Sequence, residues 1–141
     1  MERLFVDYAQ ARRLKEAGFD LPCFRYYYIG DTGTNQDHDI ESTPSKAKNH
    51  NEDSLCVSRP LRSQVLQWFR DDRQLYGSVE TDCTTYPKFC YSVKEFFGNP
   101  RDLTEREWGW KDGLYSVLYR EYNQAEKELI DYLIAKAEQS I

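Results

Sequence analysis

The chain has 141 residues, about the size of one domain. Its aromatic fraction of 15% supplies enough large side chains for a core, which excludes a chain that is disordered throughout. It holds no apolar run of membrane-spanning length and no apolar leader, so we expect a cytoplasmic protein that does not cross a membrane. The net charge of −5 is spread evenly and no basic face is visible, which disfavours nucleic acid as a partner.

The four cysteines form no C-x-x-C pair, which excludes the usual zinc-knuckle and redox spacings. In a cytoplasm they are expected as reduced thiols. Cys23 and Cys90 have apolar neighbours and are interpreted as small core residues.

The N-terminal third predicts a helix over 4–19 and then a strand over 24–29. Asp7 and Gln10 have the spacing of a capping box at the helix start. Gly18 suits the left-handed residue at its end. In the strand, Phe24, Tyr26 and Tyr28 are expected on one face.

The composition changes abruptly at about 30–54, where the sequence is rich in Asp, Asn, Ser, Thr and Gly. Such a segment buries too little apolar surface to offset its loss of conformational entropy. We therefore expect a mobile polar loop there, inserted into the domain.

The second half predicts a helix that starts at Pro60, with Trp68 and Phe69 as its core anchors. Strands are expected over 75–82, 89–96 and 114–119. A last helix follows, with Asn123 and Glu126 as its capping box.

The predicted order is α-β-(long loop)-α-β-β-β-α. Strands joined by short turns without crossover helices favour an antiparallel sheet. We therefore predict a single α+β domain over 1–141, with a sheet of about four strands and three helices packed mainly on one face.

Several segments carry a resemblance to a family. They are Leu4–Tyr8 leading to Leu14–Asp20, Pro22–Phe24 before Tyr26–Tyr28, Arg59–Leu61 before Gln67–Arg70, and Tyr122–Glu126 before a Leu/Ile-rich helix. In these the chain resembles a group of small uncharacterised proteins encoded by phages and prophages of Bacteroides-type gut bacteria. The resemblance implies a phage-related protein, and it brings no catalytic motif.

Two groups of residues offer chemistry in the polar segment. Asp31-Thr32-Gly33 is similar to the catalytic triplet of dimeric aspartic proteases, although a polar turn explains it equally well. His38 and His50, with carboxylates nearby, have the donor types for a divalent metal, but their spacing matches no known motif. We therefore assign no metal site and no cofactor.

Aromatic residues offer a binding surface instead. Trp108 and Trp110 stand two apart among charged residues, so that in an extended chain both rings point the same way. Exposed, they would anchor a partner protein; folded inward, they would close one end of the core. Tyr115 belongs to a second candidate surface, a sheet face shared by tyrosines 26, 28, 91, 115 and 119.

From these patterns we favour a non-enzymatic, phage-related accessory protein that binds a host or phage protein, with Trp108, Trp110 and Tyr115 as candidate contacts. The alternative is a small metal-dependent or Asp-based enzyme that uses the 31–53 segment.

Overall fold

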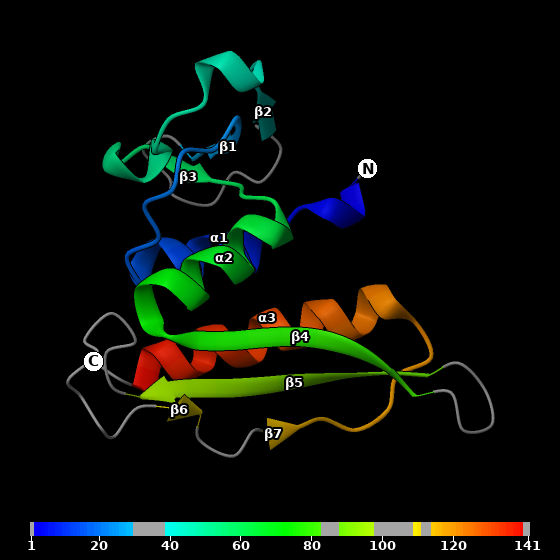
Figure 1. Ribbon diagram of the computed structural model, residues 1–141. Coiled ribbons are helices and arrows are strands. Elements are labelled where there is room, and N and C mark those ends of the chain that lie inside the picture. The colour runs from blue at the N-terminus through cyan, green and yellow to red at the C-terminus, as the bar shows by residue number, and fades with distance from the viewer. Residues whose placement is uncertain (1, 30–38, 83–87, 98–108, 111–113, 140–141) are drawn as a thin grey trace. The chain divides into compact units, whose positions relative to one another are not determined.

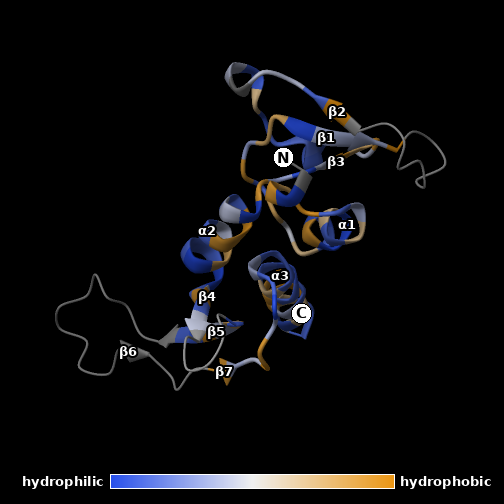
Figure 2. Cartoon of the chain, turned by 90° about the vertical axis from the view of Figure 1, so that its right-hand side faces the viewer, coloured by the Kyte–Doolittle hydropathy of each residue, from blue (hydrophilic) through white to orange (hydrophobic). Residues whose placement is uncertain are grey.

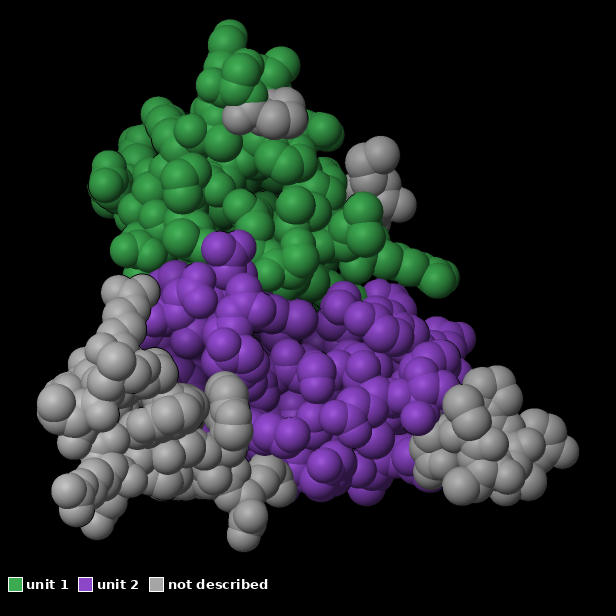
Figure 3. Space-filling model, in the orientation of Figure 1, with its two compact units in different colours: residues 1–65, 134–141 green, residues 66–133 purple. Residues whose placement is uncertain are grey.

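The computed structural model describes residues 2–29, 39–82, 88–97, 109–110 and 114–139. It confirms an α+β protein with three α-helices and antiparallel strands (Figure 1). The chain divides into two compact units, residues 1–65 with 134–141 and residues 66–133 (Figure 3). The expectation of a single domain stays a prediction.

Helix α1 (Tyr8–Glu16) follows a short 3-10 turn, η1 (Glu2–Leu4), and confirms the predicted cap. The Asp7 side chain accepts a hydrogen bond from the Gln10 amide at 2.8 Å, and the Gln10 side chain accepts one from the Asp7 amide at 3.3 Å. Because Asp7 caps the helix, α1 begins later than the expected residue 4. Gly18 has the left-handed φ of 95° expected after the helix end.

The first unit holds a three-stranded antiparallel sheet in which β1 (Arg25–Tyr28) lies between β2 (Asp39–Glu41) and β3 (Cys56–Ser58). The predicted alternation along β1 is confirmed, since Tyr27 is buried while Tyr28 on the other face is 41% exposed. Cys23, just before β1, is buried as expected.

The second part of the expected loop contains regular structure. Besides β2 it forms the 3-10 turns η3 (Pro44–Lys46) and η4 (His50–Glu52), while residues 30–38 lie outside the described residues. Its polar side chains supply the hydrogen bonds: the Asn51 amide group donates to the Phe19 carbonyl at 2.9 Å, and its oxygen accepts from the Ser58 amide at 2.8 Å. Hydrogen bonds of polar side chains therefore stabilise this segment, which lacks the hydrophobic pattern of the other elements.

Helix α2 (Arg62–Arg73) starts two residues after Pro60, and Trp68 and Phe69 are buried as predicted. Gln74 adopts a left-handed φ of 57° and turns the chain directly into the next strand.

The second unit contains a four-stranded sheet built on one long antiparallel pair, β4 (Leu75–Asp82) and β5 (Lys88–Phe97). The other edge of β5 pairs with two short strands, β6 (Gly109–Trp110) and β7 (Leu114–Tyr115). The predicted single sheet is thus replaced by two sheets, because β2 and β3 arise in segments without a strand pattern.

Helix α3 (Tyr122–Gln139) covers one face of the second sheet through its first part. A β-carbon built on Gly77 of β4 would lie 2.8 Å from Leu129 Cδ1, so the absence of a side chain permits this approach. The predicted capping box of Asn123 and Glu126 is wrong, because the helix already begins at Tyr122 and encloses both residues.

Candidate binding surface

The structure places the predicted contact residues unevenly. Trp108 lies outside the described residues. Trp110 lies in β6 opposite Phe96, and its side chain is outside the description. Tyr115 lies in β7 and is 60% exposed. The paired-tryptophan anchor therefore stays a prediction, while Tyr115 is accessible to a partner.

The expected shared face of tyrosines is wrong. Tyr26 and Tyr28 belong to the sheet of the first unit, whereas Tyr91 and Tyr115 belong to that of the second. Within the second sheet the faces also differ. The Tyr91 ring lies 6.0 Å from that of Tyr132 on α3, whereas Tyr115 pairs with Ser92 and faces away from the helix.

The chain from 115 to 119 forms a bulge along the edge of β5. Tyr115 pairs with Ser92, and Tyr119 pairs with Phe89. The segment 115–119 therefore holds one residue more than the part of β5 that it faces, as in a β-bulge. The Ser116 hydroxyl closes the gap, because it accepts a hydrogen bond from the Tyr91 amide at 2.9 Å. The Ser116 amide in turn donates to the Tyr91 carbonyl at 2.9 Å.

Apolar side chains gather at this bulged edge. Val117 is 73% exposed and Leu118 is 46% exposed, both within the bulge. We call the exposed apolar residues of this segment the edge patch: Leu114, Tyr115, Val117, Leu118 and Tyr122. In Figure 2 the hydrophobic colour marks β7 and the chain that follows it.

Aromatic rings anchor the patch to the sheet. The Tyr122 ring packs edge-on against Phe89 with centroids 5.8 Å apart, and Tyr119 stacks on Tyr91 at 6.3 Å. Burial raises the pKa of Tyr119, and the Glu128 carboxylate raises it further. The pKa of Tyr91 is raised by burial and then by nearby groups that include Tyr119, Glu128 and Tyr132. These phenols stay neutral at physiological pH.

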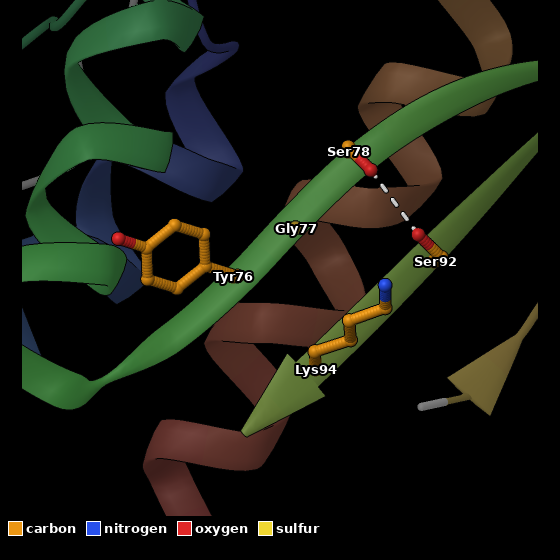
Figure 4. Close-up of a pocket in the computed structure, with 5 residues that line it drawn as sticks. All are labelled: Tyr76, Gly77, Ser78, Ser92 and Lys94. Carbon is orange, nitrogen blue, oxygen red and sulfur yellow. Dashed lines mark hydrogen bonds between the residues drawn. The ribbon is translucent and has the colours of Figure 1, made fainter. Parts of the chain in front are cut away.

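A pocket of about 260 Å³ opens on the sheet face away from α3. Tyr76, Gly77, Ser78, Ser92 and Lys94 line it (Figure 4). The Ser78 and Ser92 hydroxyls lie 3.1 Å apart, and Ser92 donates to Glu80 at 3.0 Å. Because Ser92 pairs with both Ser78 and Tyr115, the pocket lies beside β7 on the face of Tyr115. Its hydroxyls and ammonium group are suited to hydrogen bonding with polar groups of a bound partner.

His50, the described member of the predicted histidine pair, is a buried structural residue. His38 lies outside the described residues. The His50 Nε2 atom lies 3.0 Å from the Cys23 carbonyl oxygen, and its ring stacks on Tyr26 at 3.9 Å. Burial is the main cause that lowers the pKa of His50. A carbonyl oxygen only accepts, so Nε2 carries the proton of the neutral ring.

His50 lines a second pocket, of about 480 Å³, together with Lys48, Asp53 and Cys56. Burial raises the pKa of the Cys56 thiol, and the neighbouring Asp53 carboxylate adds to the effect. The thiol lies 3.7 Å from that carboxylate and donates to it, so it stays protonated and is a poor nucleophile. Burial also raises the pKa of the Cys23 thiol to about 12.

The described ranges lack two further features. Within them, no cluster of three or more His, Cys, Asp or Glu side chains is placed to hold a metal ion. Nor is any described helix both long and apolar enough to cross a membrane. Asp31, the candidate protease residue, lies outside the described residues.

Comparison with known proteins gives no relative: no protein-family model, curated protein or solved structure matches the chain.

Sequence reasoning missed Val117 and Leu118 as surface residues. The apolar run at 114–119 predicted a short strand, but only its first two residues form β7. A usable signal was present in the pattern, because Val117 and Leu118 are adjacent apolar residues that break the alternation of a half-buried strand.

Proposed function

We propose that the protein is a non-enzymatic accessory protein that binds a protein partner through the edge patch. The observation that carries this proposal is the exposure of Leu114, Tyr115, Val117, Leu118 and Tyr122 within one short segment. Single exposed apolar residues are common on protein surfaces, whereas several within one short segment, here on both faces of the sheet edge, favour an interaction site.

The position of the patch supports the same proposal. Sheet edges are usually protected by charged side chains, proline or a covering element. Here the bulge between Tyr115 and Tyr119 presents Val117 and Leu118 outward. Leaving these side chains in water has a cost that burial against a partner would recover, at about 25 cal/mol per Å² of apolar surface.

The kind of partner follows from the resemblance to phage and prophage proteins, which favours a host or phage protein. Trp110 remains in this proposal as a further contact, because β6 and β7 both pair with β5 on the same side. Trp108 remains in it as a prediction from the sequence. Trp and Tyr side chains often dominate the binding energy of an interface.

A tagged pull-down from host-cell lysate at low and moderate salt tests the proposal. The test variant carries Val117→Asp and Leu118→Asp, and the matched control carries Ile40→Asp, which changes a 38% exposed apolar residue of β2 in the first unit. We expect the wild type and the control to retain the same protein while the folded test variant loses it. Equal recovery by all three would contradict a partner site at the edge patch.

A further inference from the structure

The carboxylates around the edge patch indicate the charge of its partner. Residues 114–131 contain four acidic side chains and two basic ones, Arg120 and Lys127. The acidic ones are Glu121, Glu126, Glu128 and Asp131. These carboxylates lie in α3 or directly before it, whereas Lys94 lies beside β7 on the opposite sheet face. The α3 side of the edge is therefore the more acidic one, which suits a basic partner.

Glu128 lies on α3 one helical turn before Tyr132, whose ring lies 6.0 Å from that of Tyr91 on β5. Its charge contributes to the raised pKa of both Tyr91 and Tyr119. Tyr119 exchanges hydrogen bonds with Phe89, with N–O distances of 2.6 and 2.8 Å, so the strand pairing holds this part of the edge in place. The Glu128 carboxylate therefore lies on the side of α3 that faces β5 and Tyr119, where a basic group of a partner at this edge can approach it.

The bulge also limits how a partner can dock. An added strand needs outward-facing backbone groups at every second residue of an edge. Between Tyr115 and Tyr119 the ladder is broken by the extra residue, and the Val117 carbonyl already accepts a hydrogen bond from the Ser116 hydroxyl at 2.8 Å. Recognition at this edge therefore relies on side chains, which favours a helix over an added strand.

We propose that the edge patch binds an amphipathic helix of the partner whose apolar stripe is flanked by lysine or arginine residues. The stripe covers Val117 and Leu118, and the basic flank faces the Glu128 side of the edge. This inference rests on the proposed function and specifies the chemistry of the partner.

Two synthetic helical peptides with the same leucine stripe test the inference, one with lysines and one with glutamates along its flanks. Amide chemical shifts locate the binding, and fluorescence anisotropy gives the affinities. We expect the lysine peptide to shift the amides of residues 114–122 and to bind at least about tenfold more tightly than the glutamate peptide. Added salt should weaken its binding.

Charge variants distinguish charge-specific recognition from nonspecific hydrophobic binding. Glu128→Lys should weaken the lysine peptide about tenfold. The matched control Glu52→Lys, at an exposed carboxylate in the first unit, should leave its affinity unchanged. Equal affinity for the two peptides, no effect of Glu128→Lys, or no shifts at 114–122 with the lysine peptide would each overturn the inference.

The failure of the inference is distinguishable from that of the proposed function. If Val117→Asp with Leu118→Asp abolishes capture of the lysate protein while Glu128→Lys changes nothing, the edge patch remains a partner site and the basic flank is wrong. If capture is insensitive to the edge variant as well, both proposals fail.

Discussion

His50 is a residue whose charge state is set by packing. Its ring is buried, stacks on Tyr26 and lies with Nε2 against the Cys23 carbonyl. Burial, as the main cause, and the nearby Lys48 charge lower its pKa, while the Cys23 carbonyl and Asp53 act in the opposite direction. The net result is a neutral imidazole in the folded protein.

The lowered pKa of His50 predicts a loss of stability in weak acid. In the unfolded chain the ring takes up a proton near its ordinary pKa of 6.5, whereas the folded protein resists protonation at that pH. The free energy of unfolding should therefore be highest above pH 6.5 and fall as the pH drops toward the folded-state pKa. Urea unfolding at a series of pH values measures the slope.

The control is His50→Gln, whose amide can still donate to the Cys23 carbonyl but does not titrate. His38 is present in both proteins, so the difference between the two slopes reports His50 alone. Identical slopes for the wild type and the variant would show that His50 is not the group responsible.

Gly77 carries a second prediction at the residue scale. A β-carbon added at this position would lie 2.8 Å from Leu129 Cδ1 and 3.1 Å from Leu133 Cδ1, and both leucines are fully buried. Gly77→Ala should therefore lower the free energy of unfolding by about 1–3 kcal/mol through overpacking. Chemical denaturation measures the change.

A change of background tests that cause. Leu129→Val removes both δ-carbons, so Gly77→Ala should cost clearly less in that background. Gly18→Ala serves as the contrast, because nothing lies within 4 Å of its β-carbon and its cost comes from a φ of 95°. Gly18→Ala should lower the free energy of unfolding equally in the wild-type and Leu129→Val backgrounds. If its effect also became smaller in the Leu129→Val background, the smaller effect of Gly77→Ala there could not be assigned to steric relief.

Among the elements, the bulged edge depends on one hydroxyl group. Ser116→Ala leaves the Tyr91 amide without its acceptor at the bulge, which should cost about 1–2 kcal/mol. Ser116→Thr keeps the hydroxyl and should cost much less. Hydrogen exchange of the Tyr91 amide is the local measurement, and unchanged protection in Ser116→Ala would contradict this role.

The same scale shows what the sequence could predict. Capping predicted the Asp7–Gln10 box, although the helix was expected to start already at residue 4. Local periodicity predicted the strand at 75–82 with the bounds of β4 and the buried anchors Trp68 and Phe69. β2 and β3 escaped detection because each has three residues and exists only through pairing with β1, which is a non-local interaction.

The candidate site also contains residues that the sequence could predict and residues that it could not. Tyr115 could be named as a candidate contact from its residue type and an expected short strand, but its exposure could not be predicted, because it depends on which sheet face α3 covers. For Val117 and Leu118 the only local signal was the break in alternation at these two residues. The bulge that exposes them depends on the pairing of 115–119 with β5, which is a non-local interaction. The carboxylates of α3 became relevant only once that helix was placed against the sheet.

In the molecule as a whole, the side chains that stabilise the fold differ from those of the edge patch, which are available for binding. The side chains that pack α3 on its sheet are fully buried, whereas Val117 is 73% exposed in the folded chain. Exposed apolar side chains add little to folding but promote self-association at high concentration. The two properties should therefore respond in opposite ways to substitution at the patch.

Val117→Asp with Leu118→Asp should leave the free energy of unfolding within about 0.5 kcal/mol of the wild type, because such surface positions contribute little to stability. The same variant should remain monomeric to higher protein concentration, because it removes apolar surface and adds negative charge. Denaturant unfolding and sedimentation measure the two effects. Leu133→Asp, at a fully buried position of α3, provides the contrast and should unfold the second unit. A large loss of stability in the edge variant would mean that Val117 and Leu118 support the sheet edge itself, and their exposure would then no longer argue for a partner.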